Sequence, residues 1–212
     1  MKLYYHPISV PSLYPVFVAS AAGVEAERIL VDLQGGEQKG EGFRAVNPFG
    51  RVPAMVDDGI AIGESSAIGR YVARVSGSDI YSEDVREAAL IDQWVEFVVH
   101  HIRLNASRIM FNRVIAPITG AEVDEASIAL GEQFLADNLP HVEVALTGDG
   151  HLHGERLTLA DIALVAALEP SELAKIALSN FPVLTDWLGR MRKARWYTDV
   201  HIHFGAEMGM GG

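Results

Sequence analysis

The first 32 residues hold two β-prone segments with a helical segment between them, and this order most constrains the fold. Residues 1–5 are apolar and aromatic and stop before Pro7, residues 12–22 are mostly apolar and end at Gly23, and residues 28–32 are again rich in β-forming side chains. Two strands joined through a helix lie parallel, because parallel pairing needs a crossover of this kind. The chain therefore opens with a βαβ unit of an α/β domain.

A second pattern, two strands and then a helix, follows this unit. Residues 47–51 have turn chemistry and lead into a short apolar strand at 52–56, whose second residue is proline. A hairpin turn at 57–59 joins this strand to a returning strand at 60–62. From residue 65 to residue 77, apolar side chains recur at helical spacing. The predicted order is βαβ and then ββα.

Beyond residue 77 the pattern becomes helical almost throughout. We expect helices near residues 85–112, 122–146, 159–178 and 183–193, with breaks at Pro117, at the glycines between 148 and 154, and before Pro182. The predicted domains are an α/β domain at 1–77, a linker at 78–86 and an all-helical domain at 87–212. The segment 208–212, rich in Gly and Met, is expected to be flexible.

Composition excludes several classes of partner and chemistry. The 17 basic and 28 acidic residues give a net charge of -11, which disfavours nucleic acid and anionic membranes. The chain has no cysteine, so any thiol chemistry must use the sulfur of a substrate. No histidine pair at metal-binding helical spacing has a supporting carboxylate, and we predict no metal. We find no signal peptide or membrane span and expect a cytoplasmic protein.

Four segments together resemble the glutathione transferase family, most of all its serine-type classes and the plant phi class. They are residues 31–39, 47–54, 63–68 and 154–161. The resemblance implies a thioredoxin-like N-terminal domain followed by a helical bundle, assembled as a homodimer. It also implies an enzyme that uses glutathione as co-substrate and transfers it to a small hydrophobic electrophile. In the last segment, Thr158 and Asp161 have the spacing of a capping box, which we interpret as structural.

Two residue pairs are expected to hold the peptide part of glutathione. A cis bond between Val52 and Pro53 would free the backbone of Val52 to pair with an extended peptide, as it pairs with the cysteinyl part in similar proteins. Glu64 and Ser65 stand at a helix entrance, where the family binds the γ-glutamyl carboxylate at backbone N–H groups. The alternatives are an edge-strand proline for the first pair and a plain helix cap for the second.

Three further residues match positions that bind the glycyl end of glutathione in similar proteins. They are Gln38, Lys39 and Arg51, and the two cations would complement the carboxylate of that end. Solvated surface charges are the alternative account of Lys39 and Arg51. Phi-like sequences usually have histidine where Gln38 stands, so this contact is expected to differ.

Ser9, in the first loop, falls where the serine-type classes keep the hydroxyl that hydrogen-bonds the glutathione sulfur. A free thiol has a pKa of about 8.5, and each unit of depression requires about 1.4 kcal/mol of preferential thiolate stabilisation. A hydroxyl beside a helix N-terminus supplies energy of that order, so Ser9 is expected to stabilise the thiolate and not to act as a nucleophile. Ser12 is the reserve candidate, with helix capping as its expected role. Tyr14 stands where many phi-like sequences have arginine.

The second substrate is expected to contact one helix of the helical domain. In the family this helix helps to wall the electrophile pocket, and here it carries His100, His101, Leu104, Arg108 and Phe111. Core packing is an equal alternative for Leu104 and Phe111. The pattern does not separate conjugation from glutathione-dependent ether cleavage, dehalogenation or peroxide reduction. A different class of function is an assembly module similar to the transferase-like domain of elongation factor 1B gamma.

Overall fold

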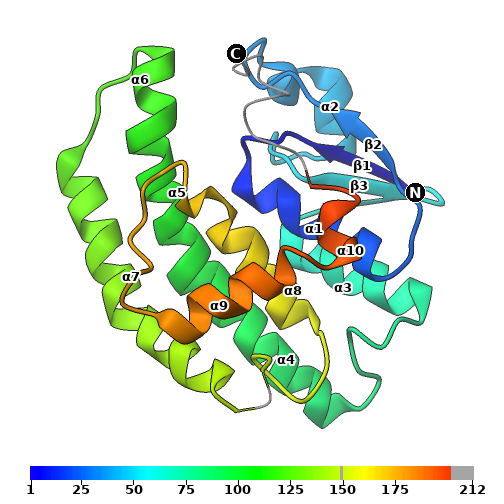
Figure 1. Cartoon of the computed structure of the whole chain (residues 1–212). Coiled ribbons are helices and arrows are strands. Elements are labelled where there is room, and N and C mark those ends of the chain that lie inside the picture. The colour runs from blue at the N-terminus through cyan, green and yellow to red at the C-terminus, as the bar shows by residue number, and fades with distance from the viewer. Residues whose placement is uncertain (149, 202–212) are drawn as a thin grey trace. The chain divides into compact units, whose positions relative to one another are not determined.

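The computed structural model describes residues 1–148 and 150–201, so segment 208–212 lies outside the described residues. The chain divides into two compact units (Figure 1). The described residues of 1–81 and 195–201 form the first unit, and the described residues of 82–194 form the second. Within the described ranges, no helix is both long enough and apolar enough to cross a membrane.

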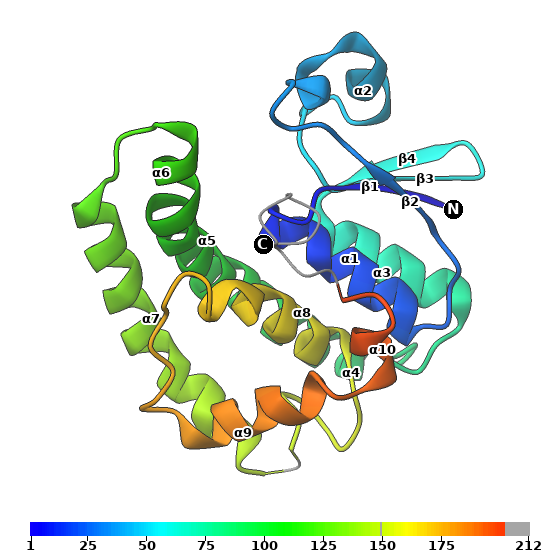
Figure 2. The same ribbon diagram turned by 45° about the horizontal axis from the view of Figure 1, so that its top comes forward.

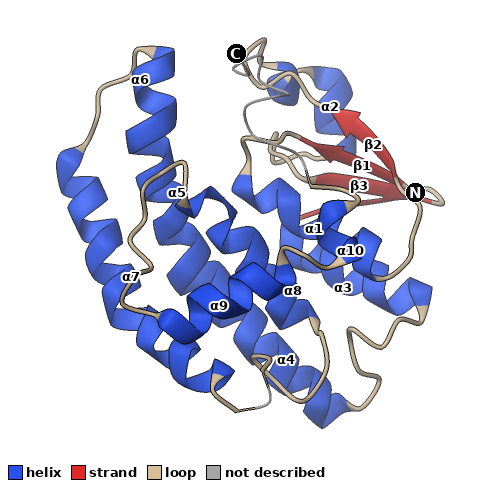
Figure 3. Ribbon diagram, viewed as in Figure 1, coloured by secondary structure: helices blue, strands red, loops and turns tan. Residues whose placement is uncertain are grey.

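The first unit is built on a four-stranded mixed sheet with the order β2-β1-β3-β4 (Figure 3). The strands are β1 (Lys2–Tyr5), β2 (Glu27–Leu30), β3 (Ala54–Asp57) and β4 (Ile60–Gly63). The pair β1–β2 is parallel, whereas β1–β3 and β3–β4 are antiparallel. The predicted thioredoxin-like domain of the α/β class is confirmed.

Helices cover both sides of this sheet. Helix α1 (Val10–Ala21) and helix α3 (Ser65–Ser76) lie together on one side, and α2 (Glu41–Val46) lies on the other (Figure 2). Helix α1 approaches α3 closely at Gly69, where an added Cβ would come 2.6 Å from the ring of Tyr14. The tyrosine at the position that is usually arginine in the phi class therefore packs inside the domain.

The chain returns to the first unit after residue 194. Helix α10 (Arg195–Thr198) places Tyr197 with its ring centroid 5.2 Å from that of Phe17 on α1, and Trp196 contacts the same ring at 5.9 Å. These aromatic contacts bury Tyr197. We expected residues 87–212 to form the helical domain, but the described residues from 195 onward pack with the sheet-containing unit.

The second unit is helical, as predicted. Its helices are α4 (Val85–Phe97), α5 (Leu104–Met110), α6 (Ala116–Thr119), α7 (Glu125–Leu146), α8 (Leu159–Leu168) and α9 (Pro182–Met191). Wider π-helical turns at Val98–Arg103 and Phe111–Ile115 connect α4, α5 and α6 into one long helical segment. All residues of α8 are buried, so this helix forms the centre of the unit.

Two predicted helix limits are wrong. The helix expected at 159–178 ends at Leu168, and a 3-10 turn with Pro170 follows, because proline has no N–H for the next helical bond. The break expected at Pro117 comes slightly later: the continuous helical segment runs past this proline and ends at Thr119, before Gly120, whose φ is 72°.

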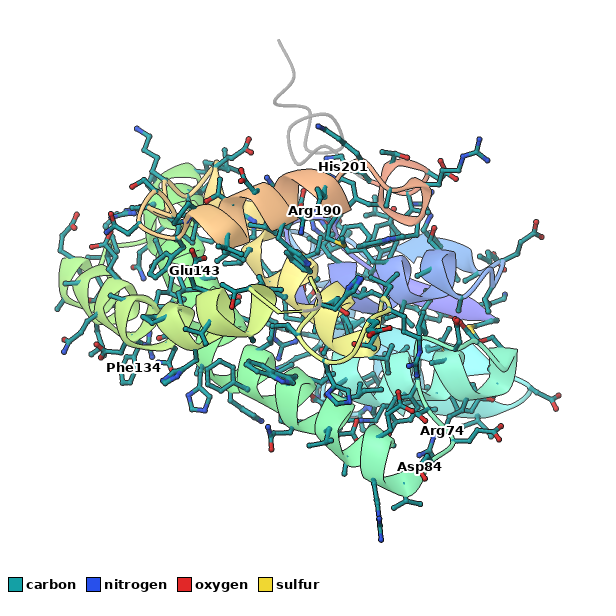
Figure 4. The ribbon with its side chains drawn as sticks, turned by 60° about the horizontal axis from the view of Figure 1, so that its bottom comes forward. Arg74, Asp84, Phe134, Glu143, Arg190 and His201 are labelled. Atoms are coloured by element: carbon teal, nitrogen blue, oxygen red, sulfur yellow. The ribbon has the colours of Figure 1, made fainter. Side chains whose placement is uncertain are left out.

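One buried and one half-buried carboxylate hold the starts of helices α8 and α9. Asp161 accepts from the backbone N–H groups of Thr158 at 2.8 Å and Leu152 at 2.9 Å, which confirms the predicted capping box. Glu143 on α7 accepts from Val183 and Leu184, the first N–H groups of α9 after Pro182 (Figure 4). One carboxylate therefore ties α7 to the start of α9.

Candidate functional site

The strand register brings the predicted glutathione-binding segments to one edge of the sheet. Tyr4 on β1 pairs with Ala54 on β3, and Ala54 pairs in turn with Gly63 on β4. Next to Tyr4, Tyr5 pairs with Leu30, the last residue of β2. The loops that leave β1, β2 and β4 and the loop that enters β3 therefore meet at this edge. They carry Ser9, the segment 31–39, the Glu64–Ser65 pair and the Val52–Pro53 pair, respectively.

Ser9 is the N-cap residue of α1. Its backbone is extended, with φ -87° and ψ 98°, and its half-buried side chain makes no capping hydrogen bond. The helix N-terminus carries partial positive charge, which favours a nearby anion. The Ser9 hydroxyl thus lies at an electropositive helix end without being used to cap it.

Ser12 has a different environment from the one we predicted. It lies inside the first turn of α1 and not at the cap, and its backbone N–H donates to the carbonyl of Ser9 at 2.7 Å. Its side chain is fully buried, and its hydroxyl has no hydrogen-bond partner within the described residues. The capping role expected for Ser12 is wrong. Ser12 is 0% exposed, so its hydroxyl is also poorly placed to contact a ligand.

The bond between Val52 and Pro53 is cis. The pairing of β3 begins at Ala54, so Val52 lies before the ladder and its backbone is not part of the β3 pairing. Pro53 is buried and Val52 is half-buried. This arrangement presents an extended backbone segment at the sheet edge, as strand addition by a peptide requires.

The buried Asn47 fixes the loop that leads into this proline. Its side-chain amide donates to the carbonyl of Arg51 at 2.6 Å and accepts from the N–H of Phe49 at 3.1 Å. A Cβ added at Gly63 would lie 3.1 Å from the same side chain, so the loop packs directly against the end of β4. Asn47 therefore sets the position of the cis bond relative to Glu64.

Glu64 has a backbone conformation that is rare for a residue with a side chain. Its φ is 65° and its ψ is 120°, and it is the N-cap residue of α3. Its side chain is exposed and makes no capping hydrogen bond, whereas Ser65 is buried. Strained backbone of this kind concentrates at functional sites. The turn leaves the first N–H groups of α3 without partners inside the helix, which suits a carboxylate ligand.

The three predicted glycyl-end residues come from two neighbouring loops. Gln38 lies against the loop before the cis proline, since a Cβ at Gly50 would be 3.0 Å from the Gln38 carbonyl. The Gln38 amide donates to the carbonyl of Leu33 at 3.4 Å, and its buried Oε1 has no partner in the described parts of the chain. Lys39 and Arg51 have exposed side chains. The loops thus present two cations beside an unused acceptor.

Two of the residues predicted for the second substrate are exposed and apolar, and the other three are polar and make side-chain contacts. Leu104 and Phe111 are 54% and 49% exposed, so the core-packing alternative is wrong for both. His101 contacts the ring of Phe97 at 5.0 Å, and the neighbouring His100 pairs with Glu96 at 3.2 Å. Arg108 is half-buried and donates to the side chain of Asn105 at 2.9 Å. Asn105 is itself buried and donates to the carbonyl of His101 in the π-helical turn.

Comparison with known proteins decides the family. The family model for the glutathione S-transferase N-terminal domain matches residues 1–74, and the model for the C-terminal domain matches residues 103–194. The chain belongs to the glutathione S-transferase family. The predicted family is thereby confirmed, and its two parts correspond to the two kinds of architecture described above.

Relatives of this glutathione S-transferase include plant enzymes and their crystal structures. Glutathione S-transferase 3 of Zea mays is 35% identical over 173 residues, which cover 79% of this chain and 78% of the relative. A glutathione transferase of Populus trichocarpa has a TM-score of 0.86 at 27% identity, covering 100% of this chain and 99% of that one. Glutathione S-transferase I of maize, solved in complex with an atrazine glutathione conjugate, has a TM-score of 0.85 at 26% identity, covering 94% and 95%. The phi-like resemblance is confirmed.

His6 is a residue at this sheet edge that we did not predict. Its Nδ1 accepts from the N–H of Ile8 at 3.2 Å, and its carbonyl accepts from the N–H of Ser9 at 3.0 Å. Burial lowers the pKa of His6 below its ordinary value of 6.5, while the charge of Asp32 acts in the opposite direction. The sequence signal was its place three residues before Ser9. In the described part of this glutathione S-transferase, no three His, Asp or Glu side chains gather as a metal site.

Proposed function

We propose that this glutathione S-transferase binds glutathione at the sheet edge of its first unit and adds the glutathione sulfur to a small hydrophobic electrophile. The observation that carries the proposal is the meeting of Ser9, the cis Val52–Pro53 bond and the Glu64–Ser65 turn at one edge, as the register requires. Each of these features suits a different part of one extended, anionic peptide ligand.

Three groups of residues hold the peptide in this proposal. The backbone of Val52 pairs with the cysteinyl residue, and the N–H groups at the start of α3 bind the γ-glutamyl carboxylate. The side chains of Lys39 and Arg51 complement the glycyl carboxylate. The Oε1 of Gln38 is buried and its amide donates to the carbonyl of Leu33, so Gln38 offers the glycyl end less than the two exposed cations do. Its contact therefore differs from that of the histidine usual in phi-like sequences.

Ser9 acts on the sulfur. When the thiol proton is lost to solvent, the Ser9 hydroxyl donates a hydrogen bond to the thiolate, and the N-terminus of α1 adds a favourable dipole. The sulfur lone pair then forms the C–S bond, and the leaving group departs with its bonding electrons. Ser9 keeps its proton throughout. Rate enhancement comes from a larger thiolate fraction and from holding both reactants together.

The maize relative supports an organic electrophile, because its structure holds glutathione joined to atrazine. The exposed apolar side chains of Leu104 and Phe111 support the same class of second substrate here. We infer that these two residues contact the electrophile, together with Arg108, His100 and His101. The relatives compared above all carry glutathione transferase names, and no contact of the described residues favours an assembly module.

We also propose a homodimer. Phe49 is 66% exposed on a loop that Asn47 holds in place, so its ring is available for a protein contact. The second unit has an aromatic surface of its own, formed by Trp94, Phe97, His101 and His141, whose rings contact one another through Phe97. Phe134, 42% exposed, lies on the same helix as His141, α7 (Figure 4). We assign this surface to Phe49 of a second copy. A cytoplasmic location and a role in detoxification stay predictions.

Conjugation of glutathione to a model aryl halide tests the proposal. We expect Ser9→Ala to reduce kcat/KM by about 10- to 100-fold, since a charge-assisted hydrogen bond contributes roughly 1.5–3 kcal/mol. Ser12→Ala is the matched control and should retain most activity, because its hydroxyl is buried away from solvent. Full activity in Ser9→Ala together with a large loss in Ser12→Ala would reverse the assignment.

A further inference from the structure

The loop that carries Ser9 is anchored by one residue, His6. Three residues follow His6 before α1 begins, and the first, Pro7, has no backbone N–H. The N–H of Ile8 donates to the His6 Nδ1 at 3.2 Å, and the N–H of Ser9 donates to the His6 carbonyl at 3.0 Å. Every backbone donor between His6 and α1 therefore ends on His6.

The bond to Ile8 requires a neutral imidazole. A ring nitrogen accepts a hydrogen bond only when it carries no proton, so the tautomer that fits this geometry has its proton on Nε2. In the imidazolium both nitrogens are donors. A protonated Nδ1 would face the N–H of Ile8, and the loop could not keep this arrangement.

The surroundings of His6 favour the neutral form. The side chain is half-buried, and this burial lowers its pKa, whereas the nearby charge of Asp32 raises it. Asp32 follows β2 at the same sheet edge, and its Oδ1 accepts from the N–H of Gly35 at 2.7 Å. The charge of Asp32 acts on the imidazole of His6. A protonated His6 would therefore be attracted to Asp32 and could no longer accept from the N–H of Ile8.

We propose that His6 is a positioning residue for Ser9: its neutral imidazole holds the loop so that the Ser9 hydroxyl meets the glutathione sulfur. This inference rests on the proposed role of Ser9. The N–H of Ser9 donates to the carbonyl of His6, and the carbonyl of Ser9 accepts from the N–H of Ser12. These two bonds fix the position of the Cα atom from which the Ser9 side chain extends. A hydrogen-bond donor must lie within a few tenths of an ångström of its required place, and a shift of about 1 Å can cost about 100-fold in rate.

Protonation of His6 should have a defined effect on the activity that depends on Ser9. If His6 did not titrate, the activity ratio of the wild type to Ser9→Ala would be largest at low pH, where the thiolate fraction is limiting. Protonation of His6 below pH 6.5 should instead reduce this ratio, because Ser9 then loses its position. Below the thiol pKa values of both enzymes, the ratio removes the decrease in rate that protonation of the thiol causes in each of them.

Two variants separate the hydrogen bond from the charge. His6→Asn keeps an acceptor, because an asparagine side chain can accept from the backbone N–H two residues further on, and it cannot titrate. His6→Leu removes the acceptor. Each is made alone and with Ser9→Ala, and kcat/KM for glutathione and an aryl halide is measured from pH 5 to pH 8, with circular dichroism as the folding control.

We expect His6→Leu to lower kcat/KM by about 10-fold at pH 7.5 and to cause no further loss in the Ser9→Ala background. His6→Asn should retain most activity. The activity ratio of His6→Asn to its double variant with Ser9→Ala should not decrease when the pH is lowered below 6.5. If His6→Leu does not fold, the pH profiles of the wild type and His6→Asn still decide. Equal losses from His6→Leu in both backgrounds, or the same acid decrease of the ratio in His6→Asn, would overturn the inference. No loss from Ser9→Ala would instead refute the proposed role of Ser9.

Discussion

At the scale of single residues, the two serines of the first loop show how local structure separates similar candidates. Sequence spacing placed both Ser9 and Ser12 near a helix start, and it could not tell which one begins the helix. The structure begins α1 at Val10, before the apolar run that starts at residue 12, with Pro11 in its first turn. That shift puts Ser9 at the cap and encloses Ser12. A three-residue difference decides exposure here, because Ser9 at the cap is half-buried and Ser12 inside the first turn is fully buried.

The same limit explains why His6 was not predicted. Its role depends on two hydrogen bonds of a loop, and loop geometry is not a periodic feature of a sequence. By contrast, the pairs Val52–Pro53 and Glu64–Ser65 were predictable, because each combines a special backbone conformation with a recognisable local motif. Both appear in the structure as a cis bond and a positive φ.

Arg51 gives a prediction for glutathione binding. Its side chain is exposed and is assigned to the glycyl carboxylate, so Arg51→Ala should raise the KM for glutathione by about 3- to 10-fold and leave kcat nearly unchanged, as expected for an exposed charge pair. Steady-state kinetics at two salt concentrations measure both effects, and the difference from the wild type should shrink at high salt. Arg86→Ala, in the other unit, is the control. A loss confined to kcat would contradict the assignment.

At the scale of elements, the order of strands and helices could be predicted from the glycines that end helices and form turns. Gly23 and Gly77 end α1 and α3 as expected, both with positive φ, and Gly59 turns the β3–β4 hairpin. The sequence did not reveal the short α2, which has a single buried side chain, Phe43, and hence no periodic pattern. It also did not reveal that α10 returns to the first unit, because this return depends on a distant contact with Phe17.

Gly69 tests the packing of α1 on α3. An alanine here would place its Cβ 2.6 Å from the Tyr14 ring, so we expect Gly69→Ala to destabilise the protein by about 1–3 kcal/mol despite the higher helix propensity of alanine. The exposed Gly189 in α9 is the matched control, since nothing lies within 4 Å of its added Cβ. Gly189→Ala should be neutral or stabilise by up to about 1 kcal/mol. Urea unfolding measures the change in stability of both variants. Equal changes would contradict the close packing of Tyr14 against Gly69.

At the scale of the whole molecule, the proposed homodimer depends on Phe49. Replacing an exposed aromatic anchor by serine removes apolar area from the proposed contact without disturbing the Asn47 bonds, one of which uses only the backbone of residue 49. Phe49→Ser should therefore shift the protein toward monomer in light scattering at micromolar concentration, with unchanged circular dichroism. Ile60→Ser is a control, because Ile60 is an exposed apolar residue at the β3–β4 hairpin. A monomeric wild type, or an unchanged dimer in Phe49→Ser, would refute this interface.

Stabilisation of the glutathione thiolate by Ser9 of this glutathione S-transferase is tested most directly by titrating the bound thiol. The ultraviolet absorbance of the thiolate, followed against pH for the enzyme–glutathione complex, gives its pKa without any electrophile. We predict a pKa of bound glutathione one to two units below the free value of about 8.5, and a return of most of this shift in Ser9→Ala. The same depressed pKa in Ser9→Ala would contradict the account.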